Sequence, residues 1–203
     1  MLMMCDKPDR SQPARGEPVR QRVLDAAERL LRDGKAEFSM RDLATEAGVS
    51  FATPFNQFGS KAAIMHALSG RRIDTMTERF AAVPHPTDTA ARVALAVETA
   101  VAVMLEEPAV NRAVMGWMGT GGPARGDALA RSQTLWTLAL VPGDGKTERV
   151  ASDLARHLAL AFRGVLSFWS AGELADEALG AAALDIAGAL LSSSPDRCRL
   201  RQS

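Results

Sequence analysis

The chain has 203 residues, of which 47% are hydrophobic and 24% charged, ordinary values for a globular protein with one large domain or a small domain joined to a larger one. The longest apolar stretch, residues 90–105, contains Arg92 and Glu98 and is too short to cross a bilayer, and residues 1–20 lack the apolar core of a secretory signal. Cys5 and Cys198 lie near opposite ends, which argues against a disulfide framework. We therefore expect a cytoplasmic protein without a membrane partner.

The formal net charge is zero, but the two parts of the chain differ slightly. Residues 1–72 hold 12 Lys+Arg and 9 Asp+Glu, whereas residues 73–203 hold 12 and 15. This asymmetry allows a DNA-binding front end on an acidic body. It argues against a non-specific architectural DNA-binding protein, because that class needs strong positive charge.

The first predicted helix follows a polar N-terminal arm. Residues 1–16 mix Pro, Gly, Ser and charged residues, a composition typical of disorder. Pro18 suits the first turn of a helix, where its missing N–H removes no bond. Apolar side chains then recur at helical spacing over residues 19–31, and Gly34 is placed to end the helix.

Two short helices are predicted next, close enough to form a helix-turn-helix. Ser39 is placed to cap the first, with Asp42 three residues later as its capping-box partner. Gly48 closes this helix, because a tight turn between helices needs a positive φ. Ser50 is the predicted cap of the second helix, which such a motif presents to the DNA major groove.

Exposed side chains of this segment are the candidate DNA contacts. Asn and Gln can bond an adenine edge in two places, and Thr or Phe can contact a thymine methyl group. Lys61 and Arg41 lie at helix starts, where an ammonium or guanidinium and free backbone N–H groups favour a phosphate. The candidate DNA-binding residues are Ser39, Arg41, Ser50, Phe51, Ala52, Thr53, Phe55, Asn56, Gln57 and Lys61.

The rest of the chain predicts a helical bundle. Ser60 is placed to cap a helix over residues 61–83, and Thr87 to cap a helix over 88–107 that is apolar almost all round and therefore central. A helix is predicted over 108–118, and another follows the loop at 119–123 and extends to about residue 140. After a turn at 141–146, the last two helices are predicted over 147–171 and 176–191, and a flexible tail over 192–203. No segment alternates with a period of two, so we predict an all-α protein of about nine helices.

Several short motifs run through the first part of the chain at fixed spacing: Ala26-Ala27, Leu30-Leu31, Arg41-Asp42-Leu43-Ala44, Ala47-Gly48-Val49-Ser50, Thr53, Phe55 and Phe58-Gly59-Ser60-Lys61. In them the segment resembles the DNA-binding domain of the TetR family of bacterial transcriptional regulators, over roughly a quarter of the chain. The resemblance implies a helix-turn-helix domain at residues 17–62 and an effector-binding and dimerisation domain at 63–191. It also implies a repressor that leaves palindromic operator DNA when a small hydrophobic effector binds.

The segment departs from the family pattern at two points. Family members usually carry two aromatic residues, often Tyr-Tyr, and then His at the positions of Phe55, Asn56 and Gln57, whereas this chain contains no tyrosine. A phosphate contact made elsewhere by a tyrosine hydroxyl must come from Asn56 or be lost. Pro54 would remove the bond to the carbonyl of Ser50 if Ser50 were the cap, so we expect a bent or late-starting recognition helix.

The last two helices and the large side chains of the body supply the remaining candidates. Small residues such as Ala155 and Gly188 permit close helix approach, and in the resembled family two such helices form the homodimer interface, which we expect here too; the alternative is monomer core. Several large side chains and one cation are candidates to contact the effector. The alternative for the large side chains is core packing, and the alternative for the cation is a solvated position or an ion pair. These candidates are Phe80, Met104, Met115, Trp117, Trp136, Phe162 and Arg163.

A second class of function remains open, a small all-helical enzyme or ligand carrier with a vestigial helix-turn-helix. The sequence offers little support for catalysis. His66, His85 and His157 do not have metal-ligand spacing, and the chain has no Cys-x-x-Cys motif and no phosphate-binding glycine loop. We expect no catalytic residues, no metal site and no cofactor.

Overall fold

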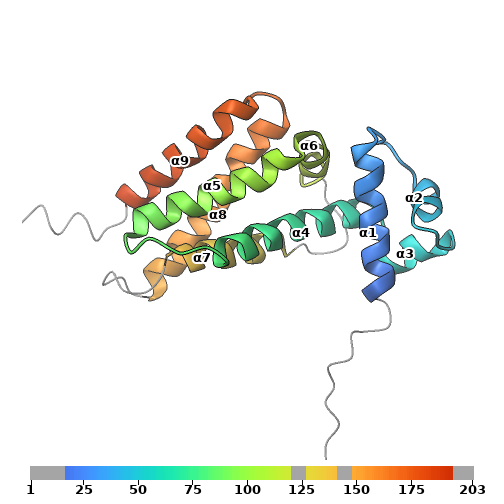
Figure 1. The fold of residues 1–203 in the computed structure, drawn as a ribbon, viewed down its shortest axis with the longest axis horizontal. Helices are drawn as coiled ribbons and strands as arrows, with labels where there is room; N and C mark the ends of the chain where they lie inside the picture. Colours follow the sequence, from blue (N-terminus) through green and yellow to red (C-terminus); the bar gives the residue numbers. More distant parts are fainter. Residues whose placement is uncertain (1–16, 120–126, 141–147, 194–203) are drawn as a thin grey trace, which may run out of the picture.

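The computed structural model describes residues 17–119, 127–140 and 148–193, and over these residues it is all-helical with no strand (Figure 1). The helices are α1 (Glu17–Arg32), α2 (Met40–Glu46), α3 (Ala52–Phe58), α4 (Lys61–Ala81), α5 (Thr89–Glu106), α6 (Pro108–Gly116), α7 (Ala128–Ala139), α8 (Glu148–Ser170) and α9 (Asp176–Ser192). The predicted all-α class is confirmed. The predicted arm at 1–16, most of the loops at 119–123 and 141–146 and the tail after residue 193 lie outside the described residues.

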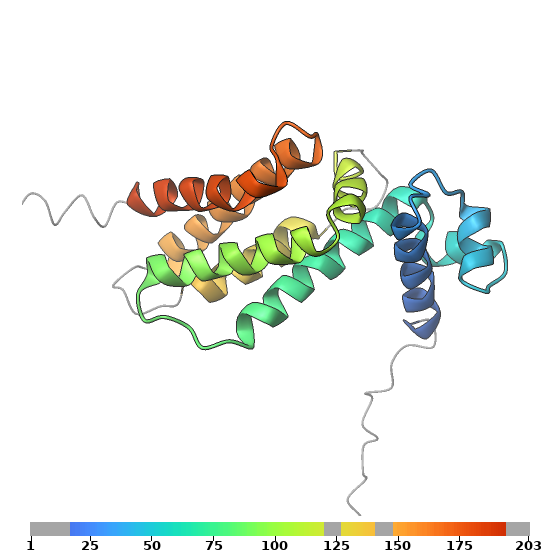
Figure 2. The same ribbon diagram turned by 45° about the horizontal axis from the view of Figure 1, so that its top comes forward.

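The helices form a small cluster at one end and a larger body (Figures 1 and 2). Helices α1, α2 and α3 make the cluster, and α4 runs from it along the body. Within the body, α7 packs on α8 and α4, and α9 packs on α8 and α5. None of the described helices is both long enough and apolar enough to span a membrane.

Local sequence signals set most helix boundaries. The capping box of α2 forms as predicted: Asp42 N donates to Ser39 Oγ at 3.2 Å, and Ser39 N donates to Asp42 Oδ2 at 2.8 Å. Gly48 has the expected positive φ of 62° after α2. Ser60 caps α4, accepting from Ala63 N at 3.2 Å.

Two predicted caps are wrong by one residue. Helix α3 begins at Ala52 after Phe51, and the Ser50 hydroxyl bonds the Thr53 hydroxyl at 2.8 Å instead of a helical N–H. With this late start Pro54 is the third helical residue, where an N–H has no intrahelical partner to lose. Helix α5 is capped by Asp88 and not by Thr87, because the Asp88 carboxylate accepts from Ala91 N at 2.8 Å.

The chain buries two hydrophobic cores. The N-terminal core joins α1 and the short helices to the first half of α4, and it includes Val110 and Val114 of α6. The body core is built around α5 and α8, with buried side chains from α4, α6, α7 and α9. Because α4 and α6 contribute to both cores, a movement of either helix changes packing on both sides.

Candidate functional site

The outer face of α3 carries most of the residues predicted to contact DNA. Phe51 and Phe55 are 53% and 43% exposed, with ring centroids 5.5 Å apart in an edge-to-face arrangement. Ala52 and Asn56 are also exposed, whereas Thr53 and Gln57 are half-buried. Two exposed phenylalanines on a short helix give an apolar surface of the kind that meets a thymine methyl group.

Two arginines of α1 hold the short helices in place, and sequence analysis missed both. The Arg20 guanidinium donates to the Gln57 carbonyl at 2.7 Å and lies 4.1 Å from the centroid of the Phe58 ring. The Arg29 guanidinium pairs with the Glu46 carboxylate at 2.7 Å and bonds the Glu46 carbonyl at 3.3 Å. Each cation therefore meets free carbonyls at a helix C-terminus, where the helix dipole favours positive charge.

The residues at the start of α2 are exposed but not all are free. The Ser39 hydroxyl donates to Asp42 Oδ2 at 2.8 Å, so it is already engaged in the capping box. These hydrogen bonds, the one from the Ser39 backbone first, lower the pKa of Asp42. Arg41 is exposed and its guanidinium lies 5.5 Å from the Phe51 ring centroid, which places a cation beside the aromatic face of α3.

Lys61 lies at the junction of the two parts of the molecule. Its ammonium donates to the Ala36 carbonyl at 2.8 Å and lies 4.4 Å and 5.2 Å from the ring centroids of Phe38 and Trp117. Burial lowers the pKa of this ammonium. The predicted phosphate contact thus has a second role, because the side chain joins the loop before α2 to the end of α6.

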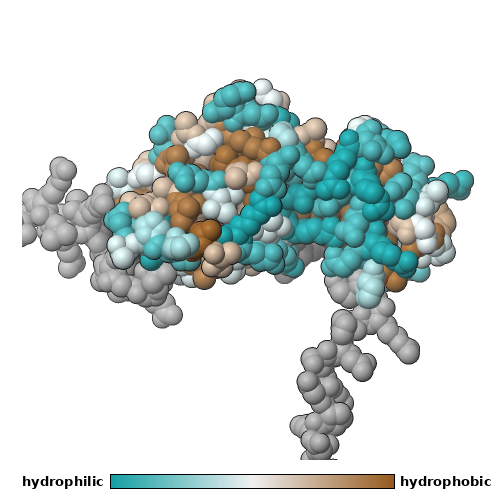
Figure 3. Space-filling view, in the orientation of Figure 1, coloured by the Kyte–Doolittle hydropathy of each residue, from teal (hydrophilic) through white to brown (hydrophobic). Residues whose placement is uncertain are grey.

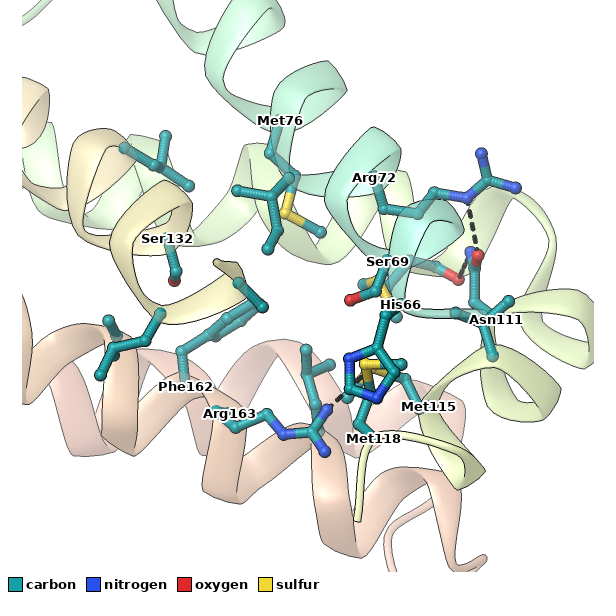
Figure 4. Close-up of a pocket in the computed structure, with 18 of the residues that line it drawn as sticks. His66, Ser69, Arg72, Met76, Asn111, Met115, Met118, Ser132, Phe162 and Arg163 are labelled. Atoms are coloured by element: carbon teal, nitrogen blue, oxygen red, sulfur yellow. Dashed lines mark hydrogen bonds between the residues drawn. The ribbon is translucent and has the colours of Figure 1, made fainter. Parts of the chain in front are cut away.

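A cavity of about 310 Å³ lies in the body between α4, α6, α7 and α8 (Figure 4). Its walls are mainly apolar, with polar groups from α4, α6, α7 and α8. The lining residues are His66, Ser69, Arg72, Ile73, Met76, Met104, Asn111, Val114, Met115, Met118, Ala128, Leu129, Ser132, Leu135, Ala159, Leu160, Phe162, Arg163 and Leu166.

Four of the seven predicted effector contacts line this cavity: Met104, Met115, Phe162 and Arg163. The other three do not. Phe80 is fully buried and stacks on His85 with ring centroids 4.3 Å apart. Trp136 packs edge-to-face behind Phe162 at 5.6 Å, and Trp117 faces Lys61. Size and apolarity alone could not separate a cavity wall from the core behind it.

The polar lining residues from α4, α6 and α7 were missed by sequence analysis. His66, Ser69, Ile73 and Met76 recur at intervals of three or four residues, so they form one stripe of α4 facing the cavity. Such a mixed stripe is a usable signal, since polar groups on an otherwise buried face need a partner. Asn111 and Ser132 have no comparable pattern around them.

One end of the cavity is tied to α1 by buried charges. Arg72 donates from Nε to Asn111 Oδ1 at 2.8 Å, from Nη1 to Glu28 Oε1 at 3.0 Å and from Nη2 to Glu107 Oε2 at 3.4 Å. Glu28 of α1 is only 7% exposed and also faces Arg71 at 3.4 Å and Arg32 at 3.7 Å. A cavity-lining cation therefore pairs directly with the helix that supports the helix-turn-helix.

Asn111 and Glu107 complete this network of Glu28, Arg32, Arg72, Glu107 and Asn111, which we call the buried network because Glu28 and Asn111 at its centre are buried, although Arg32 at its edge is exposed. The Asn111 amide donates to the Met104 and Val103 carbonyls at 2.8 Å and 3.2 Å, satisfying free carbonyls near the end of α5. The Arg32 guanidinium bonds Glu107, and this bond is the main cause that lowers the pKa of the Glu107 carboxyl. The network thus links α1, α4 and the α5–α6 corner.

Comparison with known proteins accords with this geometry. Residues 23–68 match the family model described as "Bacterial regulatory proteins, tetR family", which covers α2, α3 and the parts of α1 and α4 that pack on them. The N-terminal part of the chain is therefore similar to the TetR family of bacterial regulatory proteins. No curated protein matches the chain.

Solved structures show the same fold over most of the chain. A TetR transcriptional regulator from Rhodococcus sp. RHA1 is 20% identical, with a TM-score of 0.72, over 87% of this chain and 98% of that one. A TetR-like transcriptional regulator from the same organism is also 20% identical, with a TM-score of 0.50, over 90% and 100% of the two chains. A third Rhodococcus sp. RHA1 protein, described as of unknown function, is 25% identical with a TM-score of 0.52, over 90% and 98%.

The small and apolar residues of α8 and α9 fall into two groups, those buried within the chain and those on the outer face of the helices. Leu158, Phe162, Leu179, Ala183 and Ala187 are buried within the single chain. By contrast, Phe168 and Ile186 are exposed, and the Gly164 and Gly188 backbones face open space. In Figure 3 hydrophobic residues gather over α5 and α9, while the surface around α1 is mainly hydrophilic.

No group of His, Cys, Asp and Glu side chains suited to a metal ion occurs within residues 17–119, 127–140 and 148–193.

Proposed function

We propose that this protein is a TetR-family regulator that binds palindromic operator DNA as a homodimer and releases it when a small hydrophobic effector fills the body cavity. Repression is the proposed default, in the cytoplasm and without enzymatic activity. The proposed units are residues 17–62 for DNA binding and 63–191 for effector binding and dimerisation. The observation that carries the proposal is the buried network, because it joins a lining residue of the cavity, Arg72, to Glu28 on α1.

The proposed DNA contacts follow from the exposed side chains of α3. Phe51 and Phe55 would meet thymine methyl groups, and Asn56 would bond an adenine edge or a phosphate. Arg41 and Lys61 would contact phosphates on either side of the groove. Because the chain has no tyrosine, we propose that the polar DNA contacts near the two phenylalanines are made by neighbouring side chains: Asn56, Gln57, Thr53, Ser39 and Ser50.

Dimerisation would set the spacing of two such surfaces. One domain reads half a palindrome, and two copies bind well when their recognition helices are about 34 Å apart. The exposed Phe168 and Ile186, together with the open glycines of α8 and α9, support pairing through these two helices.

Effector release is a shift between two populations. A ligand acts only through unequal affinity for the DNA-compatible and incompatible shapes. Helix α4 lines the cavity with His66, Ser69 and Met76 and also packs in the N-terminal core with Ile64 and Met65. A ligand that tilts α4, or that disturbs Arg72 and Asn111, would therefore move α1 and the distance between recognition helices.

The first experiment offers the purified full-length protein the DNA upstream of its own gene. A specific footprint about two half-sites long is the expected result. Smearing that depends strongly on salt would support an architectural protein instead, and the absence of any shift would favour the alternative of an enzyme or ligand carrier.

A second experiment tests Lys61 as a phosphate contact. The Lys61→Ala variant should weaken binding to all DNA sequences alike and reduce the slope of log affinity against log salt by about one. Arg79→Ala is the matched control, since Arg79 lies on the same helix but pairs with Glu106 in the body. If the slope of Lys61→Ala equals that of the wild type, Lys61 serves only its contacts to Ala36, Phe38 and Trp117.

A further inference from the structure

The two arginines that line the cavity differ in how their charges are balanced. Arg72 pairs with Glu28 and Glu107, and its guanidinium points away from the cavity toward Asn111 (Figure 4). Arg163, on α8, has no carboxylate partner among the described residues, and its only bond is a donation to the Met115 sulfur at 3.2 Å. A thioether is a weak acceptor. Burial alone lowers the pKa of Arg163, so the charged guanidinium is held there without compensation.

Other polar side chains of the cavity wall form no hydrogen bond with the described residues. His66 lines the same cavity as Arg163 (Figure 4) and forms no hydrogen bond with the described residues. The Ser69 hydroxyl, on a residue 8% exposed, is likewise without a partner, and so is that of Ser132. These groups open onto the cavity, and a few polar groups that converge on a mainly apolar pocket are suited to orienting a ligand. The described lining contains no Asp and no Glu.

The remaining wall fixes the rest of the ligand's chemistry. Met76, Met104, Leu135, Phe162 and Leu166 supply an apolar surface that offers dispersion contacts but no hydrogen bonds. The volume of about 310 Å³ lies at the lower end of ligand pockets. The cavity therefore combines one unbalanced cation with an apolar chamber of small size.

We propose that the effector is a small amphipathic monocarboxylate, whose carboxylate binds Arg163 and whose apolar body fills the chamber between α4, α7 and α8. This inference rests on the proposed function, since it names the chemical class of that same effector. A guanidinium and a carboxylate match in geometry and form charge-assisted bonds.

Other ligand classes fit the cavity less well. A cation would add a second positive charge beside Arg163 with no acidic residue in the described lining to balance it. A phosphate carries up to two charges and three acceptor oxygens, whereas Arg163 is the one described lining cation without a carboxylate partner. A neutral hydrocarbon would fill the chamber but leave the guanidinium buried without an acceptor.

Matched probe pairs test the proposal by isothermal titration of the full-length protein near neutral pH. The pairs are octanoic acid with octan-1-ol and 4-phenylbutyric acid with 4-phenylbutan-1-ol, which differ only in the charged head. In the wild type each acid should bind about tenfold more tightly than its alcohol, the increment of a charge-assisted hydrogen bond. Arg163→Met should lose this preference while still binding the alcohols, and Arg163→Lys should keep part of it. Arg156→Met is the control, because Arg156 is an exposed arginine of the same helix outside the cavity.

The outcomes separate this proposal from the function on which it rests. An acid preference that disappears only in Arg163→Met supports it. Equal binding of acids and alcohols by the wild type, or a preference that persists in Arg163→Met, overturns the carboxylate class and leaves the cavity as an effector site. If no probe of either kind binds, both the carboxylate class and effector release from this cavity fail, although operator binding, measured separately, can still stand.

Discussion

The N-terminal core and the body of this protein place their candidate functional residues differently. In the N-terminal core, Val23, Ala27, Leu43 and Ile64 are completely buried, and the candidate DNA contacts lie on the outer face of α3. In the body, helices enclose a cavity lined by His66, Ser69 and Ser132 and by Arg163, which has no carboxylate partner among the described residues. The same packing rules therefore leave the candidate residues on the outer surface in one region and on the wall of a cavity in the other.

The two regions are therefore expected to differ in how their stability responds to larger side chains. A tightly packed core loses stability when a side chain grows, whereas a cavity can accept extra volume at the expense of its ligand. The buried network between Glu28 and Arg72 lies where the two regions meet, so it responds to changes on either side. Three pairs of substitutions test this contrast. Stability is compared at one fixed protein concentration, because the proposed dimer couples stability to concentration.

The largest effect is expected at the junction. Glu28→Gln removes the carboxylate that faces Arg71, Arg72 and Arg32 and leaves a cluster of cations with one fewer counter-charge. We expect the free energy of unfolding to fall by about 2–3 kcal/mol, measured by urea denaturation with circular dichroism. Glu46→Gln is the control: its partner Arg29 is exposed, so a loss below about 1 kcal/mol is expected. Equal losses in the two variants would show that the junction is no more sensitive than the surface.

The next largest effect is expected when a buried alanine is replaced by leucine, and the same replacement is made in each core. Ala27 of the N-terminal core is 0% exposed, and Ala159 in the cavity wall is 2% exposed. Ala27→Leu should overpack its core and destabilise the protein by about 2 kcal/mol, whereas Ala159→Leu grows toward empty space and should stay within about 0.5 kcal/mol of the wild type. The melting temperatures of the two variants check this, and a large loss in Ala159→Leu would contradict the cavity.

The smallest expected effect is the loss of stability at acidic pH that depends on Glu107. The bond from Arg32, with the charge of Arg72, lowers the pKa of Glu107 in the folded protein, so the unfolded chain binds a proton more readily. The stability that Glu107 contributes is therefore present above the ordinary glutamate pKa of about 4.3 and is lost as the pH falls through the lower, folded value. Because the pair is partly exposed, we expect about 0.5–1 kcal/mol.

Unfolding titrations at pH 7 and at about pH 3 test this contribution. Glu107→Gln should remove part of the difference in stability between the two pH values that the wild type shows. Glu106→Gln is the comparison within the body, where the partner Arg79 is more exposed, and it should change less. A Glu107→Gln variant as acid-sensitive as the wild type would exclude a contribution from the junction carboxylate.

Local chemistry explains which structural predictions were confirmed. The capping box of Ser39 and Asp42, the positive φ of Gly48 and the cap at Ser60 depend on residues within a few positions of one another. The predicted cap at Ser50 was wrong because the backbone before Pro54 places Phe51 at the start of α3, a choice between neighbouring positions that local propensity does not settle.

The candidate effector site was only partly predictable for a different reason. Met104 and Phe162 line the cavity, while Phe80 and Trp136 are equally apolar and lie behind its wall. Hydrophobicity indicates burial but not which buried side chain faces empty space. Arg163 stood out as a charge in an apolar run, but its lack of a carboxylate partner depends on helices distant in sequence.

The order of the helices and the caps at Ser39 and Ser60 could be predicted from the sequence, because caps depend on residues within one helical turn. The cavity, the pairing of Arg72 with Glu28 and the unbalanced charge of Arg163 were decided only by the tertiary structure. Glu28, Arg72 and Asn111 are 39 or more residues apart and meet because α1, α4 and α6 pack together. The electrostatic partner of a buried charge is a property of that packing, and no local pattern encodes it.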